Sequence, residues 1–164
     1  MSVHSDVRRR PDRWSPSPGK SCPVSYEAPG FSVLYSDEGG AAKASPRRLL
    51  AQAAARRLTE VGLPAHDGSE YAPSYEADPI QAGVFIDRHA PERRIFVLYM
   101  PSMPSILIET HHALDPREAQ RWSEPATMDA FAAATAAALV DALAAGELSR
   151  GGSGGHRMFA GAAP

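Results

Sequence analysis

The sequence contains only one cysteine, Cys22, and this scarcity excludes several kinds of site. A single thiol cannot form an intramolecular disulfide, and it cannot form a CxxC motif for metal binding or redox chemistry. Cys22 lies in a stretch rich in proline and serine, where a free and exposed thiol is expected. The cysteine content therefore predicts no covalent cross-link within the chain.

Long apolar runs and a strong charge of one sign are also absent. No stretch approaches the roughly 20 apolar residues that cross a bilayer, so the sequence predicts no transmembrane segment. Residues 1–14 lack the apolar segment of an export signal. The 17 Lys and Arg residues against 19 Asp and Glu give a net charge of −2, which favours no nucleic-acid partner.

Several common catalytic motifs are missing from the sequence as well. It contains no HExxH pair, no P-loop, no GxSxG nucleophile elbow and no GxGxxG dinucleotide loop. No Ser/His/Asp nucleophile site is evident either. Any catalytic chemistry must therefore come from residues outside these patterns.

What is present predicts one α/β domain with a mixed or parallel sheet flanked by helices. A length of 164 residues with 43% hydrophobic residues is compatible with a single core. Residues 1–6 have the pattern of the last part of a strand, and residues 31–36 form a second predicted strand. The apolar runs at 94–100 and 105–109 predict central strands that are covered on both faces.

Helices and loops are predicted between and after these strands. A helix over 46–61 should begin at Pro46 with Ser45 as its cap and end at Gly62. A short helix should begin at Pro116, capped by Asp115, and continue to about Trp122. A second, alanine-rich helix is expected over 127–145, ending at Gly146, followed by a flexible tail over 149–164. Residues 7–30 are predicted to form a loop insertion, and residues 63–92 a long surface loop.

Four residues stand out as candidates for a functional site. Glu109 follows an apolar strand, and ligands of open α/β sheets bind near such strand ends. A carboxyl group at a partly buried edge can serve as a general acid or base. His4 could present an imidazole at the same edge of the sheet. His111 and His112 follow Glu109, and because neighbouring residues in an extended segment face opposite ways, at most one should reach a shared site.

Each of these candidates also has an ordinary structural interpretation. A glutamate at a strand end commonly forms a salt bridge or caps a helix, and a single histidine is more often a surface residue than a metal ligand. From the residue pattern alone, both interpretations of Glu109 and His4 stay open.

The order of these segments resembles the zinc-dependent N-acetylmuramoyl-L-alanine amidases of the Amidase_3 type, which cleave peptidoglycan between the muramoyl lactyl group and L-alanine. The most specific segment is MPSILIET at 103–110, and SVHSD at 2–6 is similar to the family's S-[IV]-H-[AS]-[ND] pattern. GFSVLY at 30–35 and LDPREA at 114–119 resemble the strand and helix start that the family has there.

This resemblance implies specific roles. Glu109 would be the catalytic glutamate, acting as general acid and base, and His4 would be the third zinc ligand. The family's first two ligands precede the segment that resembles 2–6, so residues 1–148 would be an N-terminally incomplete catalytic domain. Catalytic zinc takes three protein ligands, and His4 alone is insufficient. His111 and His112 replace a Gly-Phe pair of the family and could contact substrate.

Three hypotheses follow from the sequence. The first is a peptidoglycan amidase of the cell envelope, with peptidoglycan or a muropeptide as substrate and Zn²⁺ as cofactor of the complete family site. The second is a non-catalytic protein that binds muropeptide or a partner protein without metal. The third is an α/β fragment without stable function, whose uncovered strand edges would favour aggregation.

Overall fold

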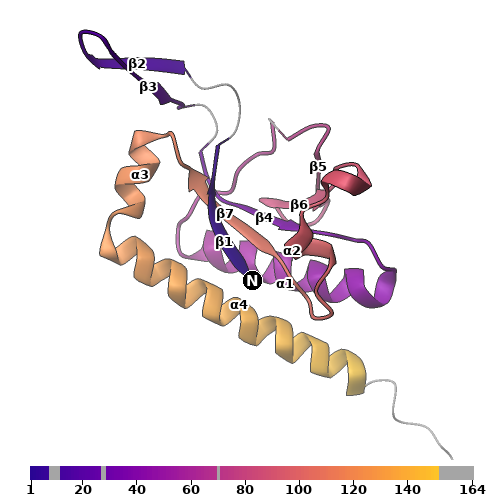
Figure 1. Ribbon diagram of the computed structural model, residues 1–164. Helices are drawn as coiled ribbons and strands as arrows, with labels where there is room; N and C mark the ends of the chain where they lie inside the picture. The colour runs from indigo at the N-terminus through magenta and orange to yellow at the C-terminus, as the bar shows by residue number, and fades with distance from the viewer. Residues whose placement is uncertain (8–11, 27–28, 70, 152–164) are drawn as a thin grey trace, which may run out of the picture.

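The computed structural model describes residues 1–7, 12–26, 29–69 and 71–151, and its centre is a mixed five-stranded sheet (Figure 1). The strand order is β1-β7-β4-β6-β5. β1 pairs with β7 in parallel and β4 with β6 in parallel, whereas β7 with β4 and β5 with β6 are antiparallel. The predicted fold class is confirmed. The strands are β1 Ser2–Asp6, β4 Ser32–Tyr35, β5 Tyr75–Ala77, β6 Val84–Asp87 and β7 Leu107–His112.

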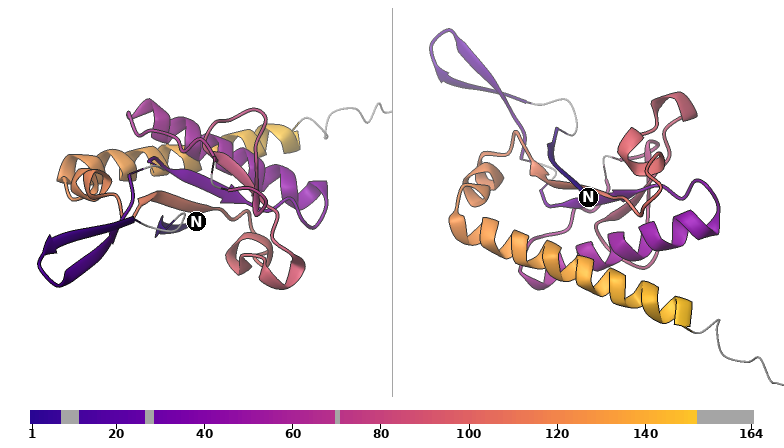
Figure 2. Two further views of the ribbon diagram at one scale, coloured as in Figure 1. Left: turned by 90° about the horizontal axis from the view of Figure 1, so that it is seen from above. Right: turned by 60° about the horizontal axis from the view of Figure 1, so that its bottom comes forward.

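Helices cover the two faces of this sheet unequally. The long helices α1 (Ala41–Glu60) and α4 (Pro125–Gly151) lie against one face, while the short helix α2 (Phe96–Tyr99) lies on the other side (Figure 2). The 3₁₀ turn η1 (Pro91–Arg93) precedes α2, and α3 (Pro116–Trp122) connects β7 to α4. The structure therefore has one closed face and one face that is only partly covered.

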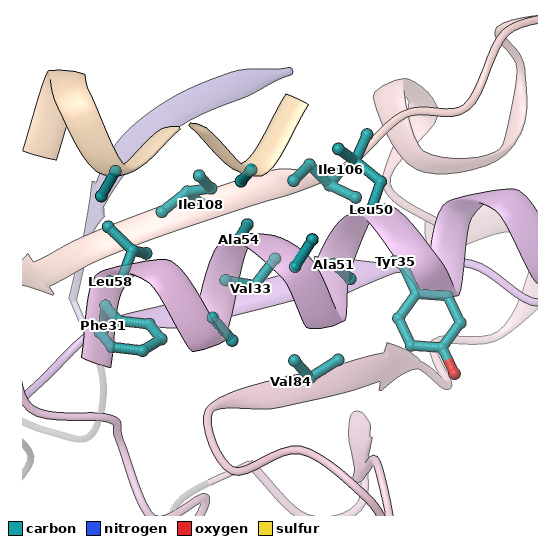
Figure 3. Close-up of a cluster of buried hydrophobic side chains, with 14 of the residues drawn as sticks. Phe31, Val33, Tyr35, Leu50, Ala51, Ala54, Leu58, Val84, Ile106 and Ile108 are labelled. Atoms are coloured by element: carbon teal, nitrogen blue, oxygen red, sulfur yellow. The ribbon is translucent and has the colours of Figure 1, made fainter. Parts of the chain in front are cut away.

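The main core lies between the sheet and α1 with α4 (Figure 3). Alternate residues of β4 and β7 supply its sheet side, and Val33 and Ile108 are fully buried there. Helix α1 supplies Ala54 and Leu58, which are also fully buried, and α4 supplies Ala138. Complete burial of a Val, Leu or Ile side chain contributes about 1.5–3 kcal/mol. The alanines let both helices lie close to the sheet.

Helix α1 begins earlier than the sequence predicts. It starts at Ala41 with Gly40 as N-cap, so Ser45 and Pro46 lie inside the helix. Gly39 and Gly40 adopt positive φ values of 86° and 78°, and this turns the chain into the helix five residues before the predicted start. The predicted end is confirmed, because Gly62 has a φ of 83° immediately after the helix.

A fully buried arginine, Arg47, connects the start of α1 to the segment before it and to the end of α2. Arg47 donates through Nη1 to the carbonyl of Glu38 at 3.0 Å and through Nη2 to the carbonyl of Tyr99 at 2.9 Å. It is 1% exposed, and its guanidinium is satisfied by backbone oxygens. Arg47 therefore belongs to the scaffold.

Helix α4 corrects one sequence expectation. It continues past Gly146 to Gly151, so the predicted helix end is wrong, and the remainder of the predicted tail, residues 152–164, lies outside the described residues. Its Pro125–Gly146 segment is long and apolar enough to cross a membrane by length and composition. Asp129 and Asp141 interrupt this segment, so it is not a continuous apolar run. The same criterion is also met by helices of soluble proteins, so it is weak evidence of a membrane span.

Three segments differ from the predicted elements. The apolar run 94–100 contains helix α2 and not a central strand, because the Asp87 carboxylate accepts the backbone N–H of Ile95 at 3.0 Å and turns the chain there. The predicted surface loop 63–92 contains β5 and the buried strand β6. These strands have three and four residues, too few for a periodic pattern to be recognised.

The predicted loop insertion at 7–30 contains an antiparallel hairpin that projects from the body (Figure 1). It consists of β2 (Asp12–Ser17) and β3 (Lys20–Val24), and Gly19 in the turn has a φ of 74°. Pro16 and Pro23 lie within these strands. A two-stranded ribbon tolerates proline because the missing N–H can face an outer edge. Proline content alone therefore gave the wrong prediction.

Candidate functional site

His4 and Glu109 lie beside each other on neighbouring strands. They are register partners of the parallel β1–β7 pair, and His4 Nδ1 is 4.0 Å from Glu109 Oε1. The side chain of His4 is 57% exposed, whereas that of Glu109 is 11% exposed. The pair therefore has an outer imidazole and an inner carboxylate, on the side of the sheet that α1 and α4 do not cover.

Several hydrogen bonds fix β1 against β7 at this point. Thr110 Oγ1 donates to the carbonyl of His4 at 3.0 Å, and the N–H of Ala113 donates to the carbonyl of Asp6 at 2.7 Å. At the other end of β1, the N–H of Ser2 donates to the carbonyl of Ile106 at 3.0 Å. The Ser2 hydroxyl also lies 3.1 Å from His4 Nε2. The position of the imidazole thus depends on contacts along the whole strand.

A tyrosine from the segment between α1 and β5 joins the same region. The Tyr71 hydroxyl lies 3.2 Å from Asp6 Oδ2 and 2.9 Å from Ser32 Oγ. Ser32 is the register partner of Glu109 on β4, opposite β1. Glu109 is therefore flanked by His4 on one side and Ser32 on the other, with Tyr71 connecting β1 to β4. This five-residue set, His4, Asp6, Ser32, Tyr71 and Glu109, is called the open-face cluster below.

Sequence reasoning missed three members of the open-face cluster. Tyr71 lies in a segment that was predicted to be a surface loop, yet it is 6% exposed, and its ring packs edge-on against Phe85 at 4.8 Å. Asp6 and Ser32 carry no motif of their own. The signal that could have found them is strand alternation, which places Asp6 and Ser32 on the same face as His4 and Glu109.

The pKa of Tyr75 is affected by the carboxylates near the open-face cluster. Burial, followed by the charges of Asp87, Asp6 and Glu109, raises the pKa of Tyr75 to about 12. Its phenol therefore stays protonated at neutral pH. Its ring packs against Tyr71 with centroids 4.7 Å apart.

His111 and His112 lie in different surroundings. The ring of His111 stacks on Trp122 with centroids 5.3 Å apart, and its Nδ1 is 2.8 Å from Thr110 Oγ1. His112 is fully buried, and its Nδ1 accepts the N–H of Leu114 at 3.1 Å. The register between β1 and β7 shifts after His4, where three residues of β7 match two of β1. Because of this irregularity, the side chains of His111 and His112 do not follow the strict alternation between the two faces that the sequence predicts.

Two carboxylates beyond β7 hold the end of that strand. Asp115 caps α3 as predicted, accepting the N–H of Arg117 at 2.9 Å, and although burial would raise its pKa, hydrogen bonds from Arg117 lower it. Glu118 accepts the N–H of Gly30 and the N–H of His112, both at 3.0 Å. In a capping box this glutamate would reach back to the cap residue. Here it ties the start of β4 to the end of β7, the two strands that carry Ser32 and Glu109.

The metal-binding capacity of the described residues is limited. Within residues 1–7, 12–26, 29–69 and 71–151, no group of three or more His, Cys, Asp or Glu side chains could hold a metal ion. Catalytic zinc sites generally take three protein ligands. His4 and Glu109 supply an imidazole and a carboxylate, which suffice for proton transfer but do not make a complete zinc site.

Comparison with protein-family models gives no match, and comparison with curated proteins gives none either. Among solved structures, the N-acetylmuramyl-L-alanine amidase Ami1 from Mycobacterium smegmatis matches with a TM-score of 0.60 and 21% identity, over 88% of this chain and 53% of that chain. The apo form of Ami1 from Mycobacterium abscessus matches with a TM-score of 0.59 and 18% identity, over 87% and 53%. The chain therefore has the α/β fold of these amidases and spans about half their length.

Proposed function

We propose that this chain acts in the hydrolysis of peptidoglycan at the amide bond between N-acetylmuramoyl and L-alanine, with Glu109 as general acid and base. The observation that carries this proposal is the contact between His4 and Glu109 on adjacent strands. The sequence resemblance assigns these two residues to one catalytic site, and they lie on β1 and β7, the first and last strands along the chain. The shared fold with the Ami1 amidases supports the same conclusion.

The chemistry requires one proton to be moved twice. Glu109 takes a proton from water while the water oxygen attacks the carbonyl carbon of the amide. When the resulting tetrahedral adduct collapses, the carboxyl group gives this proton to the departing nitrogen, and the C–N bond breaks. The products are the free lactyl carboxylic acid of the muramoyl sugar and a peptide with L-alanine at its N-terminus. The low exposure of Glu109 limits competing contact with bulk water.

His4 is the only described residue to which this proposal assigns zinc binding. The described residues do not fit a complete site, so no step is assigned to the ion. In a complete site zinc would polarise the amide carbonyl, and His4 is the residue here that would bind it. Because peptidoglycan is a polymer of the cell envelope, we propose the cell envelope as the site of action.

A second candidate function has its own supporting observation. The lack of a three-ligand group among the described residues favours a protein that binds muropeptide, or a partner, without cleaving it. The two functions differ in one measurable respect, because only the amidase releases a peptide with a free L-alanine amino group.

The test is incubation of the purified chain with an N-acetylmuramoyl-L-alanyl peptide, with and without added Zn²⁺, followed by mass spectrometry of the products. We expect release of the peptide, and we expect Glu109→Gln to slow it by about 100-fold or more. Glu92→Gln is the matched control, because Glu92 is an exposed glutamate on η1. Retention of the intact ligand without cleavage under all conditions would favour the second function.

A further inference from the structure

A groove lies between the projecting hairpin and the turn that follows β7. Its volume is about 340 Å³, and Trp14, Cys22 and Val24 of the hairpin form one wall. Leu114 and Pro116 form the opposite wall, and Tyr26 also lines it. This volume is at the lower end of the range of ligand pockets, which is about 300–1,000 Å³. The groove is thus large enough for a small ring-shaped ligand.

The two walls of the groove are fastened to each other. The N–H of Ser25 donates to the carbonyl of Leu114 at 3.0 Å, which ties the base of the hairpin to the turn. Arg117 donates through Nη2 to the carbonyl of Tyr26 at 3.1 Å, and its guanidinium lies 5.1 Å from the centre of the Tyr26 ring. Within the hairpin, Trp14 and Cys22 are register partners. The groove is therefore a built feature of the fold.

The surface of the groove suits a neutral ligand with an apolar face. The described residues that line it are aromatic, aliphatic, proline or cysteine, and none of them carries a charged side chain. Trp14 is 57% exposed, so its indole ring offers a broad flat surface to solvent. Exposed apolar residues that form a contiguous patch mark binding sites more often than single ones do. Among the described residues, the nearest charge that the contacts show is the guanidinium of Arg117, which packs on the Tyr26 ring.

The groove is linked to the candidate site through the end of β7. Ala113 and Leu114 follow β7 directly, and the N–H of Ala113 donates to the carbonyl of Asp6 in the open-face cluster. Ala113 is four positions after Glu109 along the chain, which corresponds to roughly 13 Å at the rise of an extended strand. An extended ligand held at Glu109 would reach the groove within a few sugar or amino-acid units.

We propose that this groove binds an N-acetylated sugar ring of a glycan strand, with the C–H face of the sugar stacked on Trp14. The inference rests on the proposed function, because the glycan strand is the part of peptidoglycan that extends away from the cleaved amide. N-acetylated hexosamines are uncharged, and one face of the ring presents mainly C–H groups. These properties match the neutral walls and the exposed indole.

The test uses oligomers of N-acetylglucosamine, which contain the sugar but no peptide. The sequence has two tryptophans, so Trp122→Phe leaves Trp14 as the only indole emitter. In this background we expect a saturable change in tryptophan emission on addition of the oligomers. Trp14→Ala should weaken binding about tenfold or more when it is measured by calorimetry, which is the scale of a central aromatic anchor. No saturable change at millimolar sugar would overturn the proposal.

Cys22 provides a second readout on the same wall. It is the only cysteine of the chain and is exposed, so a maleimide reagent will label one site. The oligomers should slow this labelling several-fold in the unsubstituted chain and should not slow it in Trp14→Ala. Phe96→Ala is the matched control, because Phe96 is an aromatic residue on α2 with 68% exposure. Equal protection in Trp14→Ala and Phe96→Ala would contradict the assignment to Trp14.

The outcomes separate this inference from the proposed function. Hydrolysis of a single-sugar muramoyl peptide is measured in parallel, because this substrate does not extend into the groove. Cleavage without any sugar-dependent signal from Trp14 or Cys22 would refute the groove and leave the amidase intact. Sugar binding without cleavage would support the groove and refute the amidase. A signal from apolar peptides but not from sugar would overturn the proposal in favour of a protein ligand.

Discussion

The two faces of the central sheet differ in what they bury. On the closed face, Val33 and Ile108 pack under α1 and α4 and are fully buried. On the open face, the adjacent positions of the same strands are Ser32 and Glu109, which belong to a cluster of hydrogen-bonding groups. Ile108 in the core and Glu109 in the candidate site are thus adjacent in the chain. They differ in role because successive side chains of a strand point to opposite faces of the sheet.

The open face is itself divided into two parts. One part is apolar, with Leu34, Phe85 and Leu107 packed with Leu98 of α2. The other part is polar and includes Ser32 and Glu109 of the same strands β4 and β7, and Tyr71 lies at the boundary, packing on Phe85 and hydrogen bonding to Asp6. The apolar part provides the packing that keeps the polar part in place. Substitutions in the closed-face core should therefore mainly lower stability, whereas substitutions in the open-face cluster should mainly lower function.

The largest expected loss of stability comes from the closed face. Ile108→Ala removes a fully buried side chain from the core and should lower the free energy of unfolding by about 2–5 kcal/mol. Glu109→Gln, one residue further along β7, should cost less than half as much because its shape is conserved. Urea denaturation followed by circular dichroism measures both. Equal losses would show that the two faces contribute alike to stability.

The next effect concerns the carboxylate that joins β4 to β7. Glu118→Gln replaces one of two acceptor oxygens with an NH₂ group, which cannot accept the N–H of Gly30 or His112. We expect a loss of about 1.5–3 kcal/mol, because the lost bond is buried and involves a charged group. Glu124→Gln, at an exposed position, is the control. A variant as stable as the control would refute the tie between the two strands.

A smaller loss is expected from the link across the open face. Tyr71→Phe keeps the ring packed on Phe85 but removes the hydroxyl that contacts Asp6 and Ser32. The expected cost is about 1 kcal/mol, the usual net contribution of a hydrogen bond. Thermal unfolding monitored by calorimetry measures it. An unchanged midpoint would mean that Tyr71 holds β1 to β4 by ring packing alone.

The smallest effect is expected on the outer side of α4. Leu143 is 69% exposed on this helix, so Leu143→Ser should change the free energy of unfolding by less than about 0.5 kcal/mol. This result would confirm that the closed face is the inner side of α4 only. A loss above 1 kcal/mol in urea denaturation would show that another surface covers Leu143 in solution.

The sequence predicts most where a signal is local and strong. The Asp115 cap with Pro116, the end of α1 at Gly62 and the strand before Glu109 each depend on a few adjacent residues, and the structure confirms them. Glu109 is nevertheless not the end of its strand, because β7 continues to His112. Local patterns thus predicted the presence of the strand and its functional residue, but not the residue at which the strand ends.

The sequence predicts least where distant contacts decide the structure. The apolar run 94–100 has the composition of a strand, yet Asp87 turns it into helix α2 through a bond that no local pattern reveals. Arg47 is a charged residue near the start of a helix, yet it is buried and donates to four backbone carbonyls, two of them in the segment before the helix and two at and just after the end of α2. Tyr71 joins Asp6 and Ser32 only after three separate segments meet.

The most direct test of the central claim compares Glu109→Gln with Ile108→Ala in one assay, the release of L-alanyl peptide from an N-acetylmuramoyl-L-alanyl peptide. The assay is run at a temperature at which both variants are folded. We predict that Glu109→Gln loses at least about 100-fold in rate with little loss of stability, whereas Ile108→Ala keeps most of its rate with a large loss of stability. A Glu109→Gln variant that cleaves as fast as the unsubstituted chain would contradict the account.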